Sequence, residues 1–226
     1  MEYDLFQADR GRSDEQAQAT MQFLLRLRER GIANVAVLRA LETLPRENFV
    51  PHRHADLAWR DIALPIPCGQ TMPEPYLVAR MAESLQIMSR HRILEIGTGN
   101  GYSAAILSRL ARQVVTVERF RSLALAAETR LAGLGLGNVR VFHGDGLALG
   151  DELGSFDRIL IQGAVEAVPE NIAARLVEGG TIVYGERPAG SKETNLIRVS
   201  QKAGAWTRER ISSCRLQPLV AGVSAA

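Results

Sequence analysis

The chain has 226 residues, of which 46% are hydrophobic, and its formal net charge is +2. This length and composition can fill the core of one large domain and argue against disorder. The arginines are scattered and not clustered with aromatic residues, which argues against a nucleic-acid partner. The N-terminus has no signal-peptide pattern, and no run approaches the ~18 apolar residues of a membrane span. We therefore expect a cytoplasmic protein without a membrane segment.

The first part of the chain is expected to be mainly helical. A capping-box pattern at Ser13-Asp14-Glu15-Gln16 and apolar residues at helical spacing predict a helix over 13–30, with Gly31 as its stop. A second, shorter helix follows and ends at Pro45. Residues 46–70 are rich in Pro and His with little periodicity, which predicts an ordered loop.

A third helix is predicted before the first strand. It begins near Pro75, because a proline is tolerated in the first turn, where its missing N–H would be unpaired anyway. Its apolar face extends to Met88. We expect Met81 and Met88 to be core residues at helical spacing.

From Arg92 onwards, strand and helix patterns alternate. Strands are predicted at 92–96, 114–117, 139–142, 158–161 and 181–184, and helices at about 101–111, at about 120–135 and from Pro169. The segments 195–199 and 206–211 predict a closing antiparallel pair joined near Gly204. This alternation predicts an α/β fold with a doubly wound, mainly parallel, seven-stranded sheet.

The segment from Ile93 to Tyr102 predicts a strand, a tight glycine turn and the start of a helix. Gly97, Gly99 and Gly101 can adopt positive φ and let the backbone approach a ligand. The helix that follows has free N–H groups in its first turn, which face such a ligand. The segment therefore indicates a nucleotide-cofactor site.

Three acidic residues stand at the ends of predicted strands: Glu95 just before the glycine turn, Glu118 after the second strand and Asp145 after the third. Glu118 lies where an acid accepts hydrogen bonds from ribose hydroxyls, and Asp145 where an acid holds an adenine edge. Because ligands of such sheets bind beyond the carboxyl ends of the strands, we expect the three to share one crevice.

The glycine spacing helps to choose between two cofactors. A dinucleotide site has the pattern G-x-G-x-x-G, but this chain has Tyr102 where the last glycine would stand. Glu95 would repel a pyrophosphate and attract the ammonium group of S-adenosylmethionine. The pattern thus favours S-adenosylmethionine over NAD. The alternative is that these acids are merely solvated residues at strand ends. This explanation is less favoured for the three acids together than for either Glu95 or Glu118 alone.

Residues that often bind metals are few. Cys68 and Cys214 lie far apart and outside any C-x-x-C pattern, so we expect reduced thiols and not a disulfide or zinc site. His52 and His54 lie in an Arg-rich loop without a nearby Cys or acidic cluster, which favours surface positions over metal ligation. The sequence predicts no metal centre.

Longer motifs point to one family. Residues 95–102 are close to the cofactor loop of the protein-L-isoaspartate O-methyltransferases, and Val117-Glu118-Arg119 and Gly144-Asp145-Gly146 are similar to the next two cofactor motifs of that family. More specific are Arg30-Gly31-Ile32, Leu44-Pro45-Arg46-Glu47-Asn48-Phe49-Val50-Pro51 and Gly69-Gln70-Thr71, which resemble the family's N-terminal extension. The resemblance extends from about Met21 to Leu219.

The resemblance implies a Rossmann-like class I methyltransferase fold that uses S-adenosylmethionine to methylate the abnormal carboxylate of isoaspartyl residues, as a first step of protein repair. It implies an N-terminal helical extension with a substrate-side loop at 1–90 and a cofactor-binding domain at 91–226. Isoaspartyl peptides or proteins are the expected partners. The expected cofactor-binding residues are Glu95, Gly97, Thr98, Gly99, Asn100, Gly101, Tyr102, Glu118, Arg119, Asp145 and Gly146. Tyr102 either covers the cofactor or packs under its helix, and His143 either touches adenine or packs at its strand end.

The chain departs from the family pattern on the acceptor side. The family typically reads Gly-Gln-Thr-Ile-Ser-x-Pro, whereas Pro73 stands here in place of the serine, which is treated as the active-site residue, and Glu74 follows it. Proline offers neither a hydroxyl nor an N–H, and Glu74 would repel an incoming carboxylate if it faced the crevice. The usual Thr-Ala-Ala is Gln162-Gly163-Ala164, and the C-terminal motif survives partly as Arg215-Leu216-Gln217-Pro218-Leu219.

Three hypotheses follow. The first is an active isoaspartyl methyltransferase in which Thr71, Gln162 or backbone donors replace the missing hydroxyl, with Thr71 as the candidate catalytic residue. The second is a methyltransferase that acts on another acceptor, and the third is a non-catalytic binding or regulatory protein. No metal or general base is required in the first, because the substrate carboxylate is already an anionic nucleophile.

Overall fold

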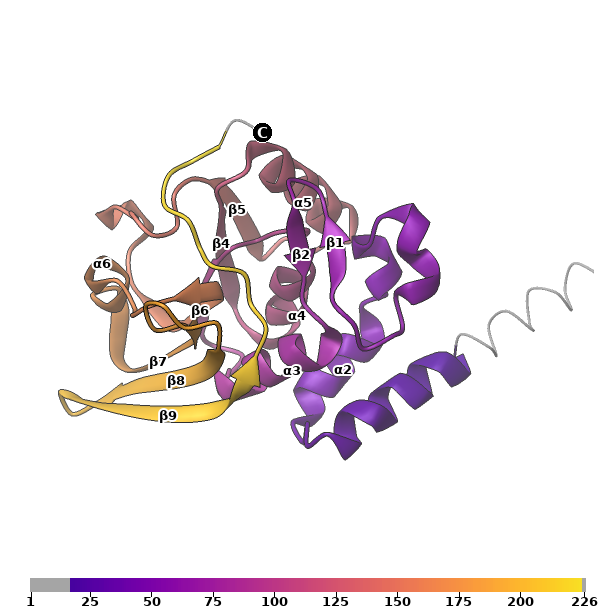
Figure 1. The fold of residues 1–226 in the computed structure, drawn as a ribbon, viewed down its shortest axis with the longest axis horizontal. Coiled ribbons are helices and arrows are strands. Elements are labelled where there is room, and N and C mark those ends of the chain that lie inside the picture. Colours follow the sequence, from indigo (N-terminus) through magenta and orange to yellow (C-terminus); the bar gives the residue numbers. More distant parts are fainter. Residues whose placement is uncertain (1–16, 225–226) are drawn as a thin grey trace, which may run out of the picture.

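A computed structural model describes residues 17–224 of the chain. Its centre is a seven-stranded sheet with the order β5-β4-β3-β6-β7-β8-β9 (Figure 1). The strands are β3 (Arg92–Ile96), β4 (Gln113–Glu118), β5 (Val139–His143), β6 (Phe156–Val165), β7 (Leu176–Glu186), β8 (Thr194–Lys202) and β9 (Ala205–Cys214). The five strands from β5 to β7 are parallel, and β8 and β9 are antiparallel. The predicted fold class is confirmed.

The strand order places a switch point in the middle of the sheet. The chain enters the large sheet at β3 and continues through β4 to β5 at one edge of the sheet. It then returns to β6, which lies on the other side of β3. Crossovers to the two sides of β3 leave a crevice beyond the carboxyl ends of β3 and β6, which is where ligands of doubly wound sheets bind.

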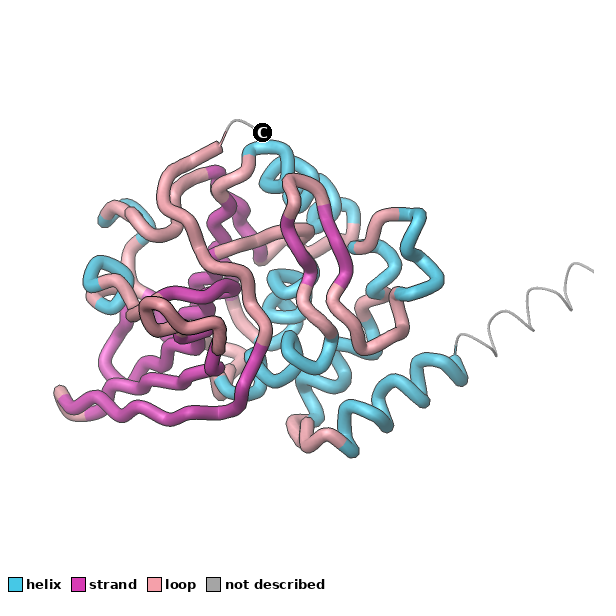
Figure 2. Tube along the Cα trace, viewed as in Figure 1, coloured by secondary structure: helices cyan, strands magenta, loops and turns pink. Residues whose placement is uncertain are grey.

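Most of the helices lie on one side of the sheet (Figure 2). Among the helices that connect the strands, α4 (Tyr102–Leu110) joins β3 to β4 and α5 (Arg121–Gly133) joins β4 to β5. The 3-10 helix η3 (Asp151–Leu153) lies between β5 and β6, and the short α6 (Glu170–Ala173) lies between β6 and β7. Residues of α4 and α5 belong to one apolar cluster and Ile172 of α6 to another. Both faces of the sheet are therefore covered, as a parallel sheet requires.

The chain before β3 forms an extension that packs on α4. It consists of a helix at 17–29, α2 (Val35–Thr43), the 3-10 helices η1 (Arg46–Phe49) and η2 (His52–Leu57), the hairpin strands β1 (Leu64–Ile66) and β2 (Gln70–Met72), and α3 (Pro75–Ser84). Phe23, Leu27 and Phe49 of this extension lie in the same apolar cluster as Ile106 and Leu107 of α4. The extension and the sheet thus share one core.

Two expectations for this extension need correction, and one lies outside the described residues. The predicted loop at 46–70 contains two 3-10 helices and the β1–β2 hairpin. The third helix begins at Pro75 as expected but ends at Ser84, because Gln86 has a φ of 51°, so Met88 is 47% exposed and is not a core residue. The capping-box residues 13–16 precede the described part of the chain.

A buried cation ties the extension together. Arg46 is 1% exposed, and its guanidinium donates to the carbonyls of Ala58 at 2.9 Å, Arg60 at 3.0 Å, Ile62 at 3.0 Å and Pro73 at 3.4 Å. Burial lowers the pKa of Arg46 to about 10, which leaves the side chain charged at neutral pH. One side chain therefore fixes both the loop before β1 and the residue that follows β2.

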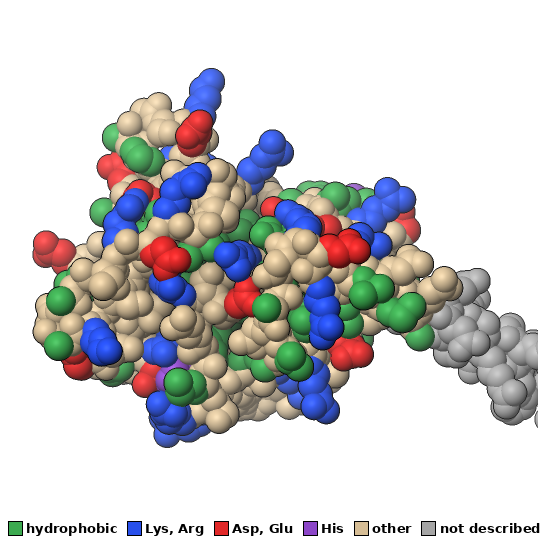
Figure 3. All heavy atoms as spheres, turned by 90° about the horizontal axis from the view of Figure 1, so that it is seen from below, with side chains coloured by type: hydrophobic (Ala, Val, Ile, Leu, Met, Phe, Trp, Pro, Cys, Tyr) green, Lys and Arg blue, Asp and Glu red, His purple; other side chains and the backbone are tan. Residues whose placement is uncertain are grey.

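The surface mixes charges of both signs. On the face shown in Figure 3, basic and acidic side chains alternate, and no large area carries a single sign. Among the described residues, no helix is long and apolar enough to cross a membrane. The same residues contain no group of three or more His, Cys, Asp or Glu that could hold a metal ion.

Candidate active site

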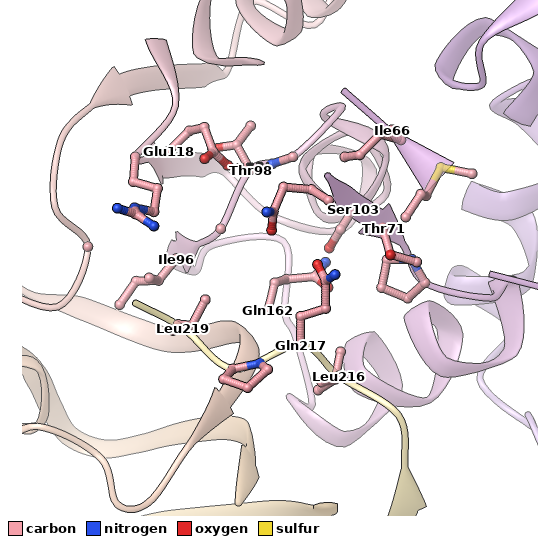
Figure 4. Close-up of a pocket in the computed structure, with 18 of the residues that line it drawn as sticks. Ile66, Thr71, Ile96, Thr98, Ser103, Glu118, Gln162, Leu216, Gln217 and Leu219 are labelled. Atoms are coloured by element: carbon pink, nitrogen blue, oxygen red, sulfur yellow. Dashed lines mark hydrogen bonds between the residues drawn. The ribbon is translucent and has the colours of Figure 1, made fainter. Parts of the chain in front are cut away.

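A pocket of about 450 Å³ opens at the carboxyl ends of β3, β4, β5 and β6. Its lining combines the glycine turn with the β1–β2 hairpin and the segment that follows β9. In Figure 4, Thr98 and Glu118 lie on one side and Thr71 and Leu216 on the other, with Ser103 between them. The pocket therefore has a glycine-turn end and a hairpin end, joined by one cavity.

The glycine turn brings bare backbone to the cavity. Gly97, Gly99 and Gly101 have φ values of 92°, 55° and 88°, in the left-handed region that glycine adopts without strain. A Cβ on Gly97 would lie 3.3 Å from Gln162, and one on Gly99 would lie 3.3 Å from Ile66. Gly101 is the N-cap of α4, so the first helical turn follows it directly, and the Tyr102 N–H of that turn donates to Asn100 Oδ1 at 3.2 Å.

Glu118 holds this turn in place. Its Oε2 accepts from the Gly99 N–H at 2.8 Å, and its Oε1 accepts from the Phe120 N–H at 3.0 Å. The residue is 5% exposed and lines the pocket. A carboxylate has about four lone-pair sites, so two remain for hydroxyl groups of a ligand.

Asp145 stands at the end of β5 and is also held by backbone donors. Oδ1 accepts from the Leu147 N–H at 2.9 Å, and Oδ2 accepts from the Gly222 N–H at 2.6 Å. Next to it, a Cβ on Gly146 would lie 2.4 Å from Ile96 Cγ2, so only glycine fits there. The C-terminal segment thus closes onto this part of the pocket, where the Arg119 Nε also donates to the Gly222 carbonyl at 2.9 Å.

Glu95 is the most buried acid of the site, with 0% exposure. Its Oε2 accepts from Thr116 Oγ1 at 2.7 Å and its Oε1 from Gln162 Nε2 at 3.3 Å, and Thr98 Oγ1 lies 2.6 Å from Thr116 Oγ1. Burial raises the pKa of Glu95 to about 7, although hydrogen bonds from Ser103, Thr116 and Gln162 oppose the rise. The negative charge of Glu118 raises this pKa further. Glu95 is therefore partly protonated near neutral pH.

Gln162 reaches the cavity through an irregularity in β6. Ile161 pairs with Tyr184 and Ala164 with Gly185, so Gln162 and Gly163 bulge out between these two pairs. Bulges of this kind occur next to active sites, where they redirect a side chain. Gly163 makes room for the C-terminal segment, because a Cβ there would lie 2.4 Å from Leu219 Cγ.

The comparisons with known proteins decide the family. A family model described as "Protein-L-isoaspartate(D-aspartate) O-methyltransferase (PCMT)" matches residues 18–224. A protein-L-isoaspartate O-methyltransferase of Rhodopseudomonas palustris (strain BisB5) is 46% identical over 204 residues, which cover 90% of this chain and 94% of the relative. The chain belongs to the protein-L-isoaspartate(D-aspartate) O-methyltransferase family. A relative from Xanthobacter autotrophicus is 43% identical over 217 residues, covering 95% of this chain and 98% of its own.

Solved structures support the same family fold. A protein-L-isoaspartate O-methyltransferase superposes with a TM-score of 0.81 at 25% identity and covers 90% of this chain and 67% of its own. A putative Plasmodium falciparum enzyme of this type, solved with S-adenosyl-L-homocysteine, gives a TM-score of 0.76 at 19% identity, with 88% of this chain and 97% of its own covered. The second likeness shows the fold alone.

Nine of the expected cofactor residues lie on the pocket wall, and two lie behind it. The wall contains Gly97, Thr98, Gly99, Asn100, Tyr102, Glu118, Arg119, Asp145 and Gly146. Glu95 and Gly101 are not part of the lining, and Glu95 is fully buried behind it, so its expected contact with a ligand stays a prediction. His143 is exposed and does not line the pocket; its Nε2 lies 3.2 Å from the Arg119 carbonyl.

Asn100 and Tyr102 connect the glycine turn to the extension. Asn100 Nδ2 donates to the Phe49 carbonyl at 2.6 Å. Tyr102 is 1% exposed, and its ring centroid lies 5.2 Å from that of Phe49. Burial raises the pKa of Tyr102, so its hydroxyl stays neutral. Tyr102 therefore packs under its helix while its edge reaches the pocket.

The hairpin end contains residues of the segment in which the sequence analysis expects a departure from the family pattern. Thr71 and Pro73 line the pocket, whereas Glu74 does not. Cys214 also lies there, and burial raises the pKa of its thiol to about 11, so it stays protonated. Glu74 was expected to repel an incoming carboxylate only if it faced the crevice, and this condition is not met.

Some site residues were not expected from the sequence. Ser103 lines the pocket from the first turn of α4, and the cations of Arg187 and Lys192 enter from the β7–β8 connection. Arg187 is fixed by its Nε, which donates to Thr194 Oγ1 at 2.8 Å, and by its Nη2, which donates to the Leu216 carbonyl at 2.7 Å. The motif-based interpretation missed them because none of them belongs to a motif.

Proposed function

We propose that this protein is an S-adenosylmethionine-dependent O-methyltransferase that methylates the abnormal carboxylate of isoaspartyl residues in damaged proteins. Membership of the family supports the activity. The observation that carries the proposal is the single cavity that joins the glycine-turn end to the hairpin end, because a cofactor and an acceptor can meet there. S-adenosylmethionine, when bound, supplies a methyl group on a positively charged sulfur.

The glycine-turn end fits this cofactor. Glu118 keeps lone pairs for the ribose hydroxyls, since only two of its acceptor sites are used by backbone N–H groups. Asp145 lines the same end of the pocket, where we expect it to hold an adenine edge. The bare backbone at Gly97 and Gly99 admits a ligand closely. These residues bind and orient the cofactor in the proposed function.

The hairpin end fits an anionic acceptor. Arg187, Lys192 and Arg215 line it, while the acids of the described lining, Glu118 and Asp145, belong to the glycine-turn end. The substrate carboxylate is already a nucleophile, so the protein has only to align it, which can lower the barrier by up to about 7–11 kcal/mol. Thr71 offers a hydroxyl donor at this end, where Pro73 has none.

The direct test is methylation of an isoaspartyl peptide beside a matched aspartyl peptide. We expect incorporation into the first only, and a lower kcat/KM for Thr71→Ala. Thr129→Ala is the matched control, because its hydroxyl donates to the Leu125 carbonyl on the exposed side of α5. A lack of incorporation despite cofactor binding would refute the isoaspartyl activity.

A second candidate is methylation of another acceptor, which the changes at Pro73 and Gln162 favour. A calorimetric titration with S-adenosylmethionine separates both methyltransferase candidates from a protein without the cofactor. In that titration we expect Glu118→Ala to weaken binding roughly 10- to 100-fold, because hydrogen bonds to a charged group are lost. A cytoplasmic location and the lack of a nucleic-acid partner stay predictions.

A further inference from the structure

Arg187 is a cation of the pocket whose guanidinium is held in one position. Its backbone N–H donates to the Val165 carbonyl at 2.9 Å, which ties the residue to the end of β6. Its Nε donates to Thr194 Oγ1 at 2.8 Å, and its Nη2 donates to the Leu216 carbonyl at 2.7 Å. Three segments, namely β6, β8 and the segment that follows β9, therefore fix this side chain.

These bonds leave part of the guanidinium unused. A guanidinium carries five N–H donors, and the two side-chain bonds of Arg187 use one on Nε and one on Nη2. Within residues 17–224, no group accepts from Nη1 and no acid forms an ion pair with Arg187. Both N–H groups of Nη1 and the second one of Nη2 thus remain. Neighbouring N–H groups of a planar guanidinium are the arrangement that binds both oxygens of a carboxylate.

The guanidinium belongs to the hairpin end of the pocket. Arg187 lines the cavity together with Leu216, which lies at this end with Thr71 (Figure 4). Burial and the charge of Glu74 raise the pKa of the Cys214 thiol, whereas the positive charge of Arg187 opposes this rise. Because Cys214 is part of the lining, Arg187 lies close to this wall. The unused donors therefore stand where the acceptor is expected.

Two other cations line the same end, but neither is held in this way. Lys192 and Arg215 are exposed, and in the described part of the chain neither side chain donates a hydrogen bond. A side chain that is already ordered loses less freedom when it binds a ligand. A forked guanidinium also orients a carboxylate, whereas the ammonium of Lys192 acts as a point charge. Arg187 is thus the best prepared of the three to position a carboxylate.

We propose that the unused donors on Nη1 and Nη2 of Arg187 bind the carboxylate that becomes methylated, in a chain whose Pro73 offers neither a hydroxyl nor an N–H. This rests on the proposed function, since it assigns a residue to the acceptor of the same reaction. A bidentate pair uses two of about four lone-pair sites of the carboxylate, so the others stay available for nucleophilic attack. The carboxylate loses negative charge in the transition state, so the pair lowers KM more than it raises kcat.

The test compares two peptides that differ in this one group. The first is an isoaspartyl peptide with its free carboxylate, and the second is its isoasparagine counterpart, which has a carboxamide there. Calorimetry with saturating S-adenosylhomocysteine measures the binding of each without turnover. Arg187→Met weakens binding of the isoaspartyl peptide roughly 10- to 100-fold, the worth of hydrogen bonds to a charged group, and weakens binding of the carboxamide peptide far less. In the methylation assay the loss appears mainly in KM.

Arg210→Met is the matched control. Arg210 is also held through Nε, which donates to Asn195 Oδ1 at 2.8 Å, and through Nη2, which donates to Ser213 Oγ at 2.9 Å, but it lies outside the pocket. We expect this variant to change neither peptide affinity. Arg187→Lys keeps the charge and loses the fork, so it restores only part of the preference for the carboxylate. Unchanged binding of S-adenosylhomocysteine by every variant shows that the fold and the glycine-turn end are intact.

Three outcomes overturn the inference. Equal losses for the two peptides would mean that Arg187 shapes the pocket through Leu216 without binding the carboxylate. A loss of affinity for S-adenosylhomocysteine with an unchanged preference between the peptides would mean that the guanidinium serves the cofactor. An unaltered preference and KM in Arg187→Met would mean that other groups hold the carboxylate. If the wild-type protein itself does not methylate the isoaspartyl peptide, the proposed function fails as well, which distinguishes the two failures.

Discussion

Replacing Glu95 with glutamine removes a titrating carboxyl group from a fully buried site while keeping its shape. The pKa of Glu95 is raised from 4.5 to about 7, mainly by burial, so the folded protein holds this proton more tightly than the unfolded chain does. Stability then falls as the pH rises between these two values, because the unfolded chain gains more by ionising. Glutamine has no proton to lose, so the variant lacks this dependence.

The magnitude follows from the two pKa values. One pKa unit corresponds to about 1.4 kcal/mol, so the full effect above pH 7 is about 3 kcal/mol. Between pH 5 and pH 8 the wild-type protein loses about 2.5 kcal/mol of unfolding free energy through this group. We expect Glu95→Gln to become more stable than the wild type by about this amount at pH 8, relative to the difference at pH 5.

Urea denaturation of both proteins at these two pH values, without cofactor, measures the effect. Cofactor must be absent, because a ligand that binds the folded state adds its own stabilisation. Equal differences between variant and wild type at both pH values would refute the reasoning, since they would mean that Glu95 titrates alike in both states. A gain in stability together with a loss of cofactor affinity would link the burial of Glu95 to its use at the site.

Three further variants test separate parts of the pocket. Pro73→Ser raises kcat/KM for an isoaspartyl peptide roughly 10-fold if only the hydroxyl is missing, because a hydrogen bond to a carboxylate is restored; no gain in the peptide assay would indicate a remodelled pocket. Gly163→Ala costs about 1–3 kcal/mol in urea denaturation, because its Cβ would overlap Leu219; an unchanged midpoint would show that the C-terminal segment moves freely. Arg46→Met lowers unfolding free energy by at least about 3 kcal/mol, because four carbonyls lose a donor. Arg26→Met is its exposed control, expected within about 0.5 kcal/mol of the wild type, and equal losses for the two would contradict the role of Arg46.

The sheet could be predicted from the sequence because its signals are local. Apolar runs bounded by glycine predict strands, and β3 through β9 lie where these runs stand. The β1–β2 hairpin lacked such a signal. Its strands have three residues each, and its turn uses Cys68 and Gly69 at φ values of 60° and 65°, where Asn-Gly or Asp-Gly would have been recognised.

The positions of the site residues were predictable only in part. Glu118 lines the pocket as expected, because the ends of parallel strands meet at one edge. Glu95 pairs with Thr116 and so lies on the same face of the sheet as Glu118, but it is fully buried and its carboxylate accepts from Thr116 and Gln162. Motif spacing gives the order of residues along the strand and says nothing about the tertiary contacts that decide which atom faces the ligand.

Two of the segments that are expected to depart from the family pattern, the β6 bulge and the C-terminal segment, contact each other. Gly163 leaves room for Leu219, and the Ala164 N–H donates to the Gln217 carbonyl at 2.8 Å, so the C-terminal segment packs on the bulge that contains Gln162. On the other side of the cavity, the Pro73 carbonyl accepts from the buried Arg46 at 3.4 Å. The cofactor affinity of Pro73→Ser should stay unchanged whatever its effect on methylation, because Glu118 holds the glycine turn through the Gly99 N–H and residue 73 makes no such bond to the turn in the described structure.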